Sequence, residues 1–154
     1  MDPVNILGLI ATCGTLAKTT VTGIQGVYAY CQTYSAAEQQ LQALSSRLAS
    51  IRAALSGLRG WIQTHGRKID KDMLEALQGT IESCHVVLSA VNTDVEKFKS
   101  LESGENKMRI KNRVRYTLSE GSIDIHSRTL DSQIGALNLV VNIMKMYVTS
   151  TVVR

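Results

Sequence analysis

Leucine and isoleucine recur along residues 41–62 at steps that alternate between three and four. The positions are Leu41, Leu44, Leu48, Ile51, Leu55, Leu58 and Ile62. This spacing is typical of a helix that packs nearly parallel or antiparallel to its neighbours. Ser35 and Glu38 form a capping box at its expected start, and Gly66 marks its expected end. Because Gly57 and Gly60 inside it each cost about 1 kcal/mol against alanine, we expect a close-packed neighbour beside them.

A second stripe of the same spacing predicts a helix that follows Asp70 and ends before Gly104. Its positions are Leu74, Leu77, Ile81, Cys84, Leu88, Val91, Val95 and Phe98. Asp70 is a favourable N-cap, and Ile69 and Leu74 occupy the two positions of a hydrophobic staple.

A third stripe predicts another helix near the C-terminus, with Ser122 or Asp124 as its cap. Its positions are Leu130, Ile134, Leu137, Val141, Met144 and Val148, and Val140, Ile143 and Tyr147 widen the apolar face.

The segment 107–116 alternates basic and apolar residues, as a strand does. However, Ile110, Val114 and Leu118 also share one helical face. A lone strand would have no partner in this chain, so we expect a short helix there.

The N-terminal segment differs from these helices in its charge. Between Asp2 and Glu38 the only charged residue is Lys18. Asp2 and Pro3 suit the N-cap and the first helical position. We expect the face toward the bundle to hold Leu7, Ile10, Gly14, Ala17, Val21, Ile24, Tyr28 and Cys31. Where a surface helix would carry Lys and Glu, the other face carries small and uncharged residues, namely Thr12, Thr15, Thr19, Thr20 and Thr22, with Gly8, Gly23 and Gly26.

Two environments suit this helix. From Pro3 to Val27 it has the ~20 largely apolar residues that span a bilayer, and small residues let helices approach closely in lipid. The small positions are Gly8, Gly14, Gly23 and Gly26. Without lipid it can be an ordinary core helix of the bundle, which is the simpler interpretation. In a membrane Lys18 would have to snorkel, face a pore or stay at the interface.

Composition supports one all-α domain over residues 1–154, an antiparallel bundle of four to five helices. The 154 residues are 44% hydrophobic and 5% aromatic, with a single proline, Pro3. Three cysteines without CxxC spacing predict reduced thiols in a cytoplasmic protein, and Asp2 stands where a secretory signal needs positive charge.

Catalytic and metal-binding patterns are weak. Glu82 and His85 form one E-x-x-H, half of what a carboxylate-bridged metal site needs. An ordinary boundary histidine is the favoured interpretation. His65 and His126 lie in other segments, without a nucleophile motif beside them. We therefore expect no enzyme activity, no cofactor and no metal.

The densest charge cluster lies on the segment 107–115. It consists of Lys107, Arg109, Lys111, Arg113 and Arg115. In a chain of formal net charge +4, it can serve as a solvated face or bind an anionic leaflet, where each residue contributes about 1 kcal/mol. Nucleic acid is a less suitable partner because aromatic residues do not accompany the charge.

Several stretches resemble the fungal HeLo-like domains, also described as the N-terminal domain of fungal STAND (NLR-type) proteins. They are the opening Met-Asp-Pro-Val-Asn-Ile-Leu-Gly-Leu-Ile-Ala-Thr-Cys, the small-residue run to Tyr34, and Leu-Ser-Ser-Arg-Leu-Ala-Ser-Ile-Arg-Ala-Ala-Leu at 44–55. Such domains are helical bundles similar to the four-helix executioner domain of the mixed-lineage-kinase-like pseudokinase of animal necroptosis.

The resemblance implies a cell-death execution domain of the kind that acts in heterokaryon incompatibility. Such a domain rests in the cytoplasm and oligomerises when an amyloid-signalling NLR partner activates it. Its N-terminal helix, within residues 1–34 here, then permeabilises the plasma membrane, and residues 107–115 would contact phospholipid. The alternative is a non-lytic adaptor that signals through contacts between bundles.

Overall fold

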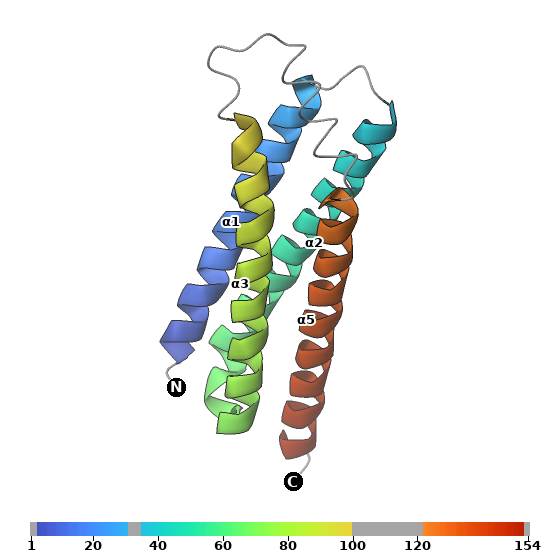
Figure 1. Cartoon of the computed structure of the whole chain (residues 1–154). Helices are drawn as coiled ribbons and strands as arrows, with labels where there is room; N and C mark the ends of the chain where they lie inside the picture. Colours follow the sequence, from blue (N-terminus) through green and yellow to red (C-terminus); the bar gives the residue numbers. More distant parts are fainter. Residues whose placement is uncertain (1–2, 31–34, 100–121, 153–154) are drawn as a thin grey trace.

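The computed structural model describes residues 3–30, 35–99 and 122–152. They form α1 (Pro3–Tyr30), α2 (Ser35–His65), the 3-10 turn η1 (Gly66–Lys68), α3 (Lys71–Lys99) and α5 (Ser122–Val152). Consecutive long helices run in opposite directions, so the chain goes up, down, up and down (Figure 1). The predicted all-α antiparallel bundle is confirmed with four long helices in the described residues. The fifth helix, expected over residues 110–118, lies outside them.

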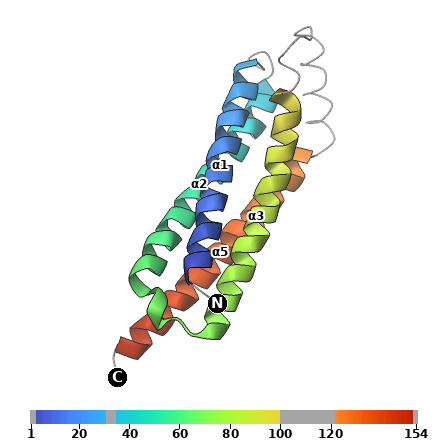
Figure 2. The same cartoon turned by 90° about the vertical axis from the view of Figure 1, so that its left-hand side faces the viewer.

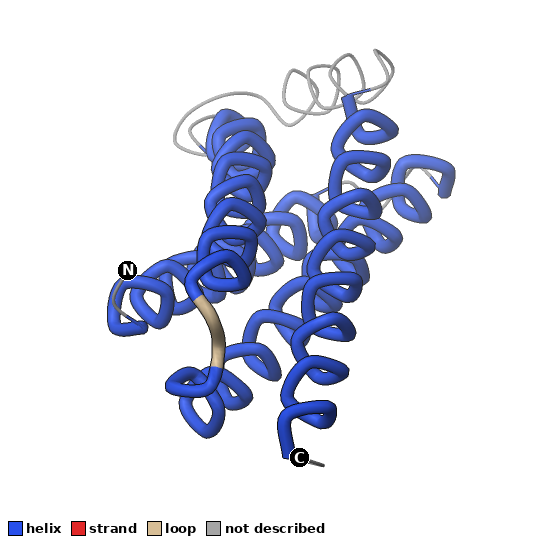
Figure 3. The backbone as a smooth tube through the Cα atoms, turned by 90° about the horizontal axis from the view of Figure 1, so that it is seen from below, coloured by secondary structure: helices blue, strands red, loops and turns tan. Residues whose placement is uncertain are grey.

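The four helices enclose one hydrophobic core. α1 packs against α2 and α3, and α5 packs against the same two helices (Figure 2). Viewed from below, the start of α1 and the end of α5 lie on different sides of the bundle (Figure 3). Displacing α1 would therefore uncover one side of α2 and α3 while α5 still covers another.

The stripes of α2 and α3 lie where the sequence predicts. All seven positions of the α2 stripe are buried, as are those of α3 from Leu74 to Val95. The side chain of Phe98 lies outside the described residues. The expected neighbour beside Gly57 and Gly60 was wrong, because both are exposed and a Cβ added at either would meet open space.

Asp70 defines the junction between η1 and α3. Its Oδ1 accepts the backbone N–H of Met73 at 2.9 Å, and its carbonyl accepts that of Leu74 at 3.1 Å. Ile69 packs against the core that contains Leu74. The predicted cap of α3 is therefore confirmed, as is the end of α2 at His65.

α5 is less deeply packed than its stripe predicts. Ile123, Leu130, Leu137 and Met144 are buried at every seventh position, whereas Ile134, Val141 and Val148 are half-buried. Ile143, expected to widen the buried face, is 44% exposed, and Leu139 and Met146 are 61% and 73% exposed. A single row of α5 residues therefore reaches the core, and an apolar row remains on the surface.

Candidate membrane-active helix

α1 is docked through a face offset from the predicted one. Its buried side chains are Ile6, Ile10, Cys13, Ala17, Thr20 and Ile24. Ile10, Ala17 and Ile24 belong to the predicted face, but Leu7, Gly14 and Val21 are only half-buried. Tyr28 and Cys31 have no described side-chain environment. The helix is thus rotated by less than one residue from the predicted orientation.

The reason for the offset is the lack of charge on α1. In α2 and α3, charged residues mark the surface and leave one choice of buried face. In α1 the rows 6–13–20 and 7–14–21 are both uncharged, so shape decides between them. The expectation that Thr20 lies on the outer face was wrong, because it belongs to the row that packs and is fully buried. Its Oγ1 donates to Leu16 O at 2.7 Å and lies 3.3 Å from Asn92 Oδ1 on α3.

The outer face of α1 carries threonine hydroxyls and one cation. Thr12, Thr15, Thr19 and Thr22 are exposed, and each donates to the carbonyl four residues earlier at 2.9–3.0 Å. Threonines on the other helices do the same, for example Thr64 and Thr80. What distinguishes α1 is therefore the concentration of these internally satisfied hydroxyls beside a single charge, Lys18.

In the part of the chain that the structure describes, α1 is the one helix that is long and apolar enough to cross a bilayer. The segment Asn5–Gln25 has 21 residues and a mean hydropathy of 1.2. At 1.5 Å per residue it is about 31 Å long, close to the ~30 Å hydrocarbon core of a membrane. Core helices of soluble proteins can have the same length and hydropathy, but only 33% of this segment is buried here.

The predicted site residues separate into two groups. Pro3 begins α1, Gly8 and Lys18 are exposed, and Gly23 lies in the interior. Gly26 and Val27 belong to α1, but their side chains lie outside the description. The second group lies wholly outside the described residues. It consists of Lys107, Arg109, Lys111, Arg113 and Arg115. Its predicted contact with phospholipid stays a prediction.

The three histidines have separate neighbours. His65 stacks on Trp61 with ring centroids 5.1 Å apart. His126 Nε2 lies 2.6 Å from Asp94 Oδ2, which joins α5 to α3. His85 is half-buried on α3. Within the described ranges, no group of three or more His, Cys, Asp or Glu side chains is placed to hold a metal ion.

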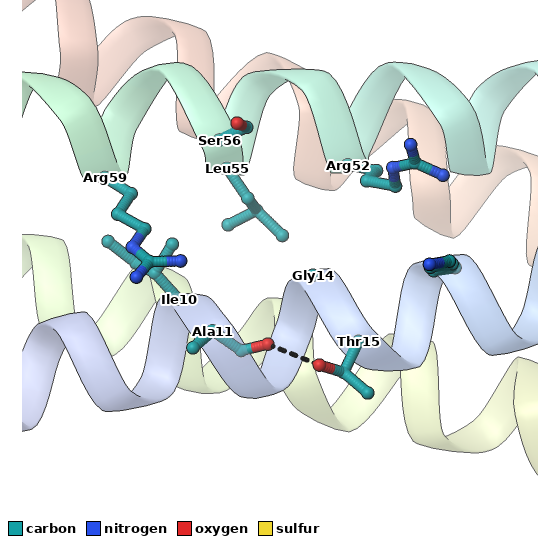
Figure 4. A pocket seen from close by; sticks show the side chains of 9 residues that line it. Ile10, Ala11, Gly14, Thr15, Arg52, Leu55, Ser56 and Arg59 are labelled. Atoms are coloured by element: carbon teal, nitrogen blue, oxygen red, sulfur yellow. Dashed lines mark hydrogen bonds between the residues drawn. The ribbon is translucent and has the colours of Figure 1, made fainter.

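Sequence reasoning missed a groove beside Lys18. It lies between α1 and α2, has a volume of about 280 Å³, and is lined by Lys18, Arg52 and Arg59 among others (Figure 4). Ile10 and Leu55 form its buried floor. One signal was available, because Arg52 and Arg59 are seven residues apart and so share a helical face. The sequence does not show that Arg52 and Arg59 face α1, because this depends on how α1 and α2 pair.

Comparisons with protein-family models, with curated proteins and with solved structures found no match for this chain. The function must therefore be argued from the chain itself.

Proposed function

We propose that this protein permeabilises anionic membranes by releasing α1 from the bundle and inserting it into the bilayer. One observation carries the proposal: among the described helices, all four long ones could span a bilayer by length, but α1 alone has an apolar window with a single charge on its outer face. The other described long helices carry more charge than α1, for example Arg47, Arg52 and Arg59 on α2, so they would stay in water or at the interface.

Burial sets the cost of release. Ile6, Ile10 and Ile24 are at most 2% exposed. At about 1.5–3 kcal/mol each, transferring these three side chains to water costs roughly 5–9 kcal/mol. Hydrocarbon returns most of this part of the cost because it solvates isoleucine as well as the core does, whereas the faces of α2 and α3 that α1 uncovers add a further cost. Release is therefore favourable only beside lipid, which keeps the isolated protein a closed bundle.

Insertion also has a polar cost. Lys18 at the centre of a bilayer would cost about 2.5–3.5 kcal/mol, less if it snorkels. The threonine hydroxyls add little because each is already bonded within the helix. In lipid they and the glycines would form the contacts between copies of α1. Insertion thus becomes more favourable when several copies meet, consistent with activation by clustering.

The biological setting follows from the resemblance to fungal HeLo-like domains. The proposal places the protein in the cytoplasm at rest and at the plasma membrane after an amyloid-signalling NLR partner clusters it. The outcome would be regulated cell death.

The test is dye release from phosphatidylserine-containing vesicles. Thr12→Asp/Thr19→Asp adds two charges to the exposed face of α1 and leaves its buried face unchanged. Each carboxylate should cost about 2.5–3.5 kcal/mol at mid-membrane, so this variant should fold normally and cause no leakage. Ser46→Asp/Ser50→Asp adds the same charge to the exposed face of α2 and should leak as wild type does. Equal leakage from both variants, or none from the wild type, would refute the proposal.

A second candidate function, the non-lytic adaptor, is favoured by the exposed apolar row of α5. Leu139, Ile143 and Met146 share one surface and would be covered if two bundles met there. This function predicts that the protein self-associates without leakage. Changing all three residues to serine would then abolish association, whereas a leakage mechanism based on α1 would keep its activity.

A further inference from the structure

We propose that the groove between α1 and α2 is a binding site for phosphate groups. Lys18 comes from α1, whereas Arg52 and Arg59 come from α2, and all three line the same cavity. The site is complete only when α1 is docked, because each helix supplies part of the positive charge.

The charge balance of the groove favours an anion. The residues that line it include three cations and no Asp or Glu. Ion pairs within the described residues involve Arg47, Lys71 and His126 instead. Lys18, Arg52 and Arg59 therefore line the groove without a described acidic partner, and an anion held there would be attracted by all three. Guanidinium groups suit phosphate because they donate two parallel hydrogen bonds.

The shape of the groove gives room for a ligand. In Figure 4, Arg59 reaches from α2 toward Ile10 at one end, and Arg52 lies toward the other. The two arginines are two turns apart, about 10 Å along α2. Between them Gly14 faces open space, where a Cβ would meet no atom within 4 Å. The spacing suits a ligand with two anionic groups, or one phosphate beside an apolar chain on the floor of Ile10 and Leu55.

Binding would affect the state of α1. A ligand that contacts both helices binds the docked bundle and not the opened one, so it stabilises the docked state by mass action. This consequence rests on the proposed function, but the binding itself does not. The phosphate can come from a soluble molecule, which would delay release, or from a lipid headgroup, which would hold the closed bundle on the membrane first.

Inorganic pyrophosphate is the probe for the soluble source. Arg52→Gln/Arg59→Gln removes two exposed arginines of the groove, and Arg67→Gln/Lys68→Gln removes two exposed cations from η1 as the matched control. Calorimetric titration of the full chain should show at least tenfold weaker binding for the groove variant and less than a twofold change for the control. Equal weakening in both variants would mean general attraction to a basic protein and would overturn the proposal.

Vesicle sedimentation with phosphatidylserine, compared with phosphatidylcholine, distinguishes the lipid source. If the groove variant loses pyrophosphate binding but sediments normally, the groove binds soluble phosphates. If it loses sedimentation with phosphatidylserine, the groove binds headgroups. If the groove variant matches the wild type in both pyrophosphate binding and vesicle sedimentation, the proposal is overturned.

The two proposals can fail separately. Thr12→Asp/Thr19→Asp lies outside the groove and should retain pyrophosphate binding even when leakage is lost.

Discussion

Cys13 on α1 and Cys84 on α3 are both fully buried and hydrogen-bonded to each other across the interface between the two helices. The Cys13 thiol donates in turn to the carbonyl of Ile81 at 3.6 Å. The hydrogen bond to Cys13, together with burial, holds the pKa of the Cys84 thiol far above its ordinary value. Burial keeps both sulfurs away from reagents in solution while α1 is docked, and the raised pKa further disfavours the reactive thiolate of Cys84.

The rate at which the Cys84 thiol is labelled gives a direct measure of the release of α1. In a Cys31→Ser background, we expect a thiol reagent to label Cys13 and Cys84 slowly in buffer. Phosphatidylserine vesicles should accelerate labelling of Cys84, since departure of α1 uncovers it, whereas Cys13 would enter the hydrocarbon with α1 and stay shielded. Mass spectrometry of the labelled chain provides the rate.

The control for thiol labelling is phosphatidylcholine, which lacks net charge and should leave the rate unchanged. Leakage from anionic vesicles without faster labelling of Cys84 would show that the membrane is damaged by a bundle that stays closed.

Ile81 offers a way to loosen the α1–α3 interface without changing α1. It is fully buried, so Ile81→Val should lower the free energy of unfolding by about 0.5–1.5 kcal/mol. The same change should speed labelling of Cys13. Val86→Ala on α3 removes apolar atoms at a position 67% exposed and should stay within about 0.5 kcal/mol of wild type. Urea denaturation measures the free energy of unfolding of both variants. An equal loss of stability in the two would contradict the packing described.

The fold could be predicted from the sequence wherever charge and apolar spacing agree. In α2, Arg47 and Arg52 stay outside the core while Leu48 and Ile51 enter it, and the stripe was predicted without error. In α1 the polar residues are mostly threonines, which can be buried when bonded to their own helix, as Thr20 is. The choice of its buried face therefore depends on packing that the sequence pattern does not contain.

The groove could not be predicted because it is a property of two helices together. In the sequence, Lys18 only interrupts an apolar segment, and Arg52 and Arg59 stand among the polar positions between the apolar residues of 41–62. Their relation depends on the antiparallel pairing and axial register of α1 and α2. Register is set by side-chain shape along the whole interface, and no local motif encodes it.

The carboxylate of Asp70 links the start of α3 to the end of α5. A hydrogen bond from the Tyr147 hydroxyl and the negative charge of Asp70 raise the pKa of Tyr147. The stability gained from this contact is present below the ordinary tyrosine pKa of about 10 and is lost as the pH rises through the raised value. Asp70→Asn retains the helix cap but removes the charge, so the pKa of Tyr147 should fall, as an NMR titration of its ring would show.

Asp70→Ala separates the two roles of this residue. It loses the bond to the Met73 N–H as well as the charge, and should cost about 0.5–2 kcal/mol of stability at neutral pH. Asp70→Asn should cost clearly less. Identical costs for the two substitutions would show that the cap contributes little.

Two polar contacts that attach α5 to the bundle should differ in strength. Arg47 Nε and Asp131 Oδ1 are 2.8 Å apart, but the aspartate side chain is 56% exposed. Asp131→Asn should therefore cost less than about 1 kcal/mol. His126 and Asp94 are 16% and 30% exposed and 2.6 Å apart, so Asp94→Asn should cost about 1–3 kcal/mol. Chemical denaturation would contradict this order if Asp131→Asn proved the more costly substitution.

Lys18 gives the strongest prediction about insertion itself. Lys18→Leu replaces a side chain that costs about 2.5–3.5 kcal/mol at mid-membrane by one that favours lipid. If α1 crosses the bilayer, half-maximal leakage should need at least tenfold less protein than for the wild type. Lys145→Leu removes the same charge from an exposed position on α5 and controls for weaker attraction to the anionic surface. If Lys18→Leu leaks no more than Lys145→Leu, residue 18 does not enter the hydrocarbon, and α1 acts at the interface instead of spanning the membrane.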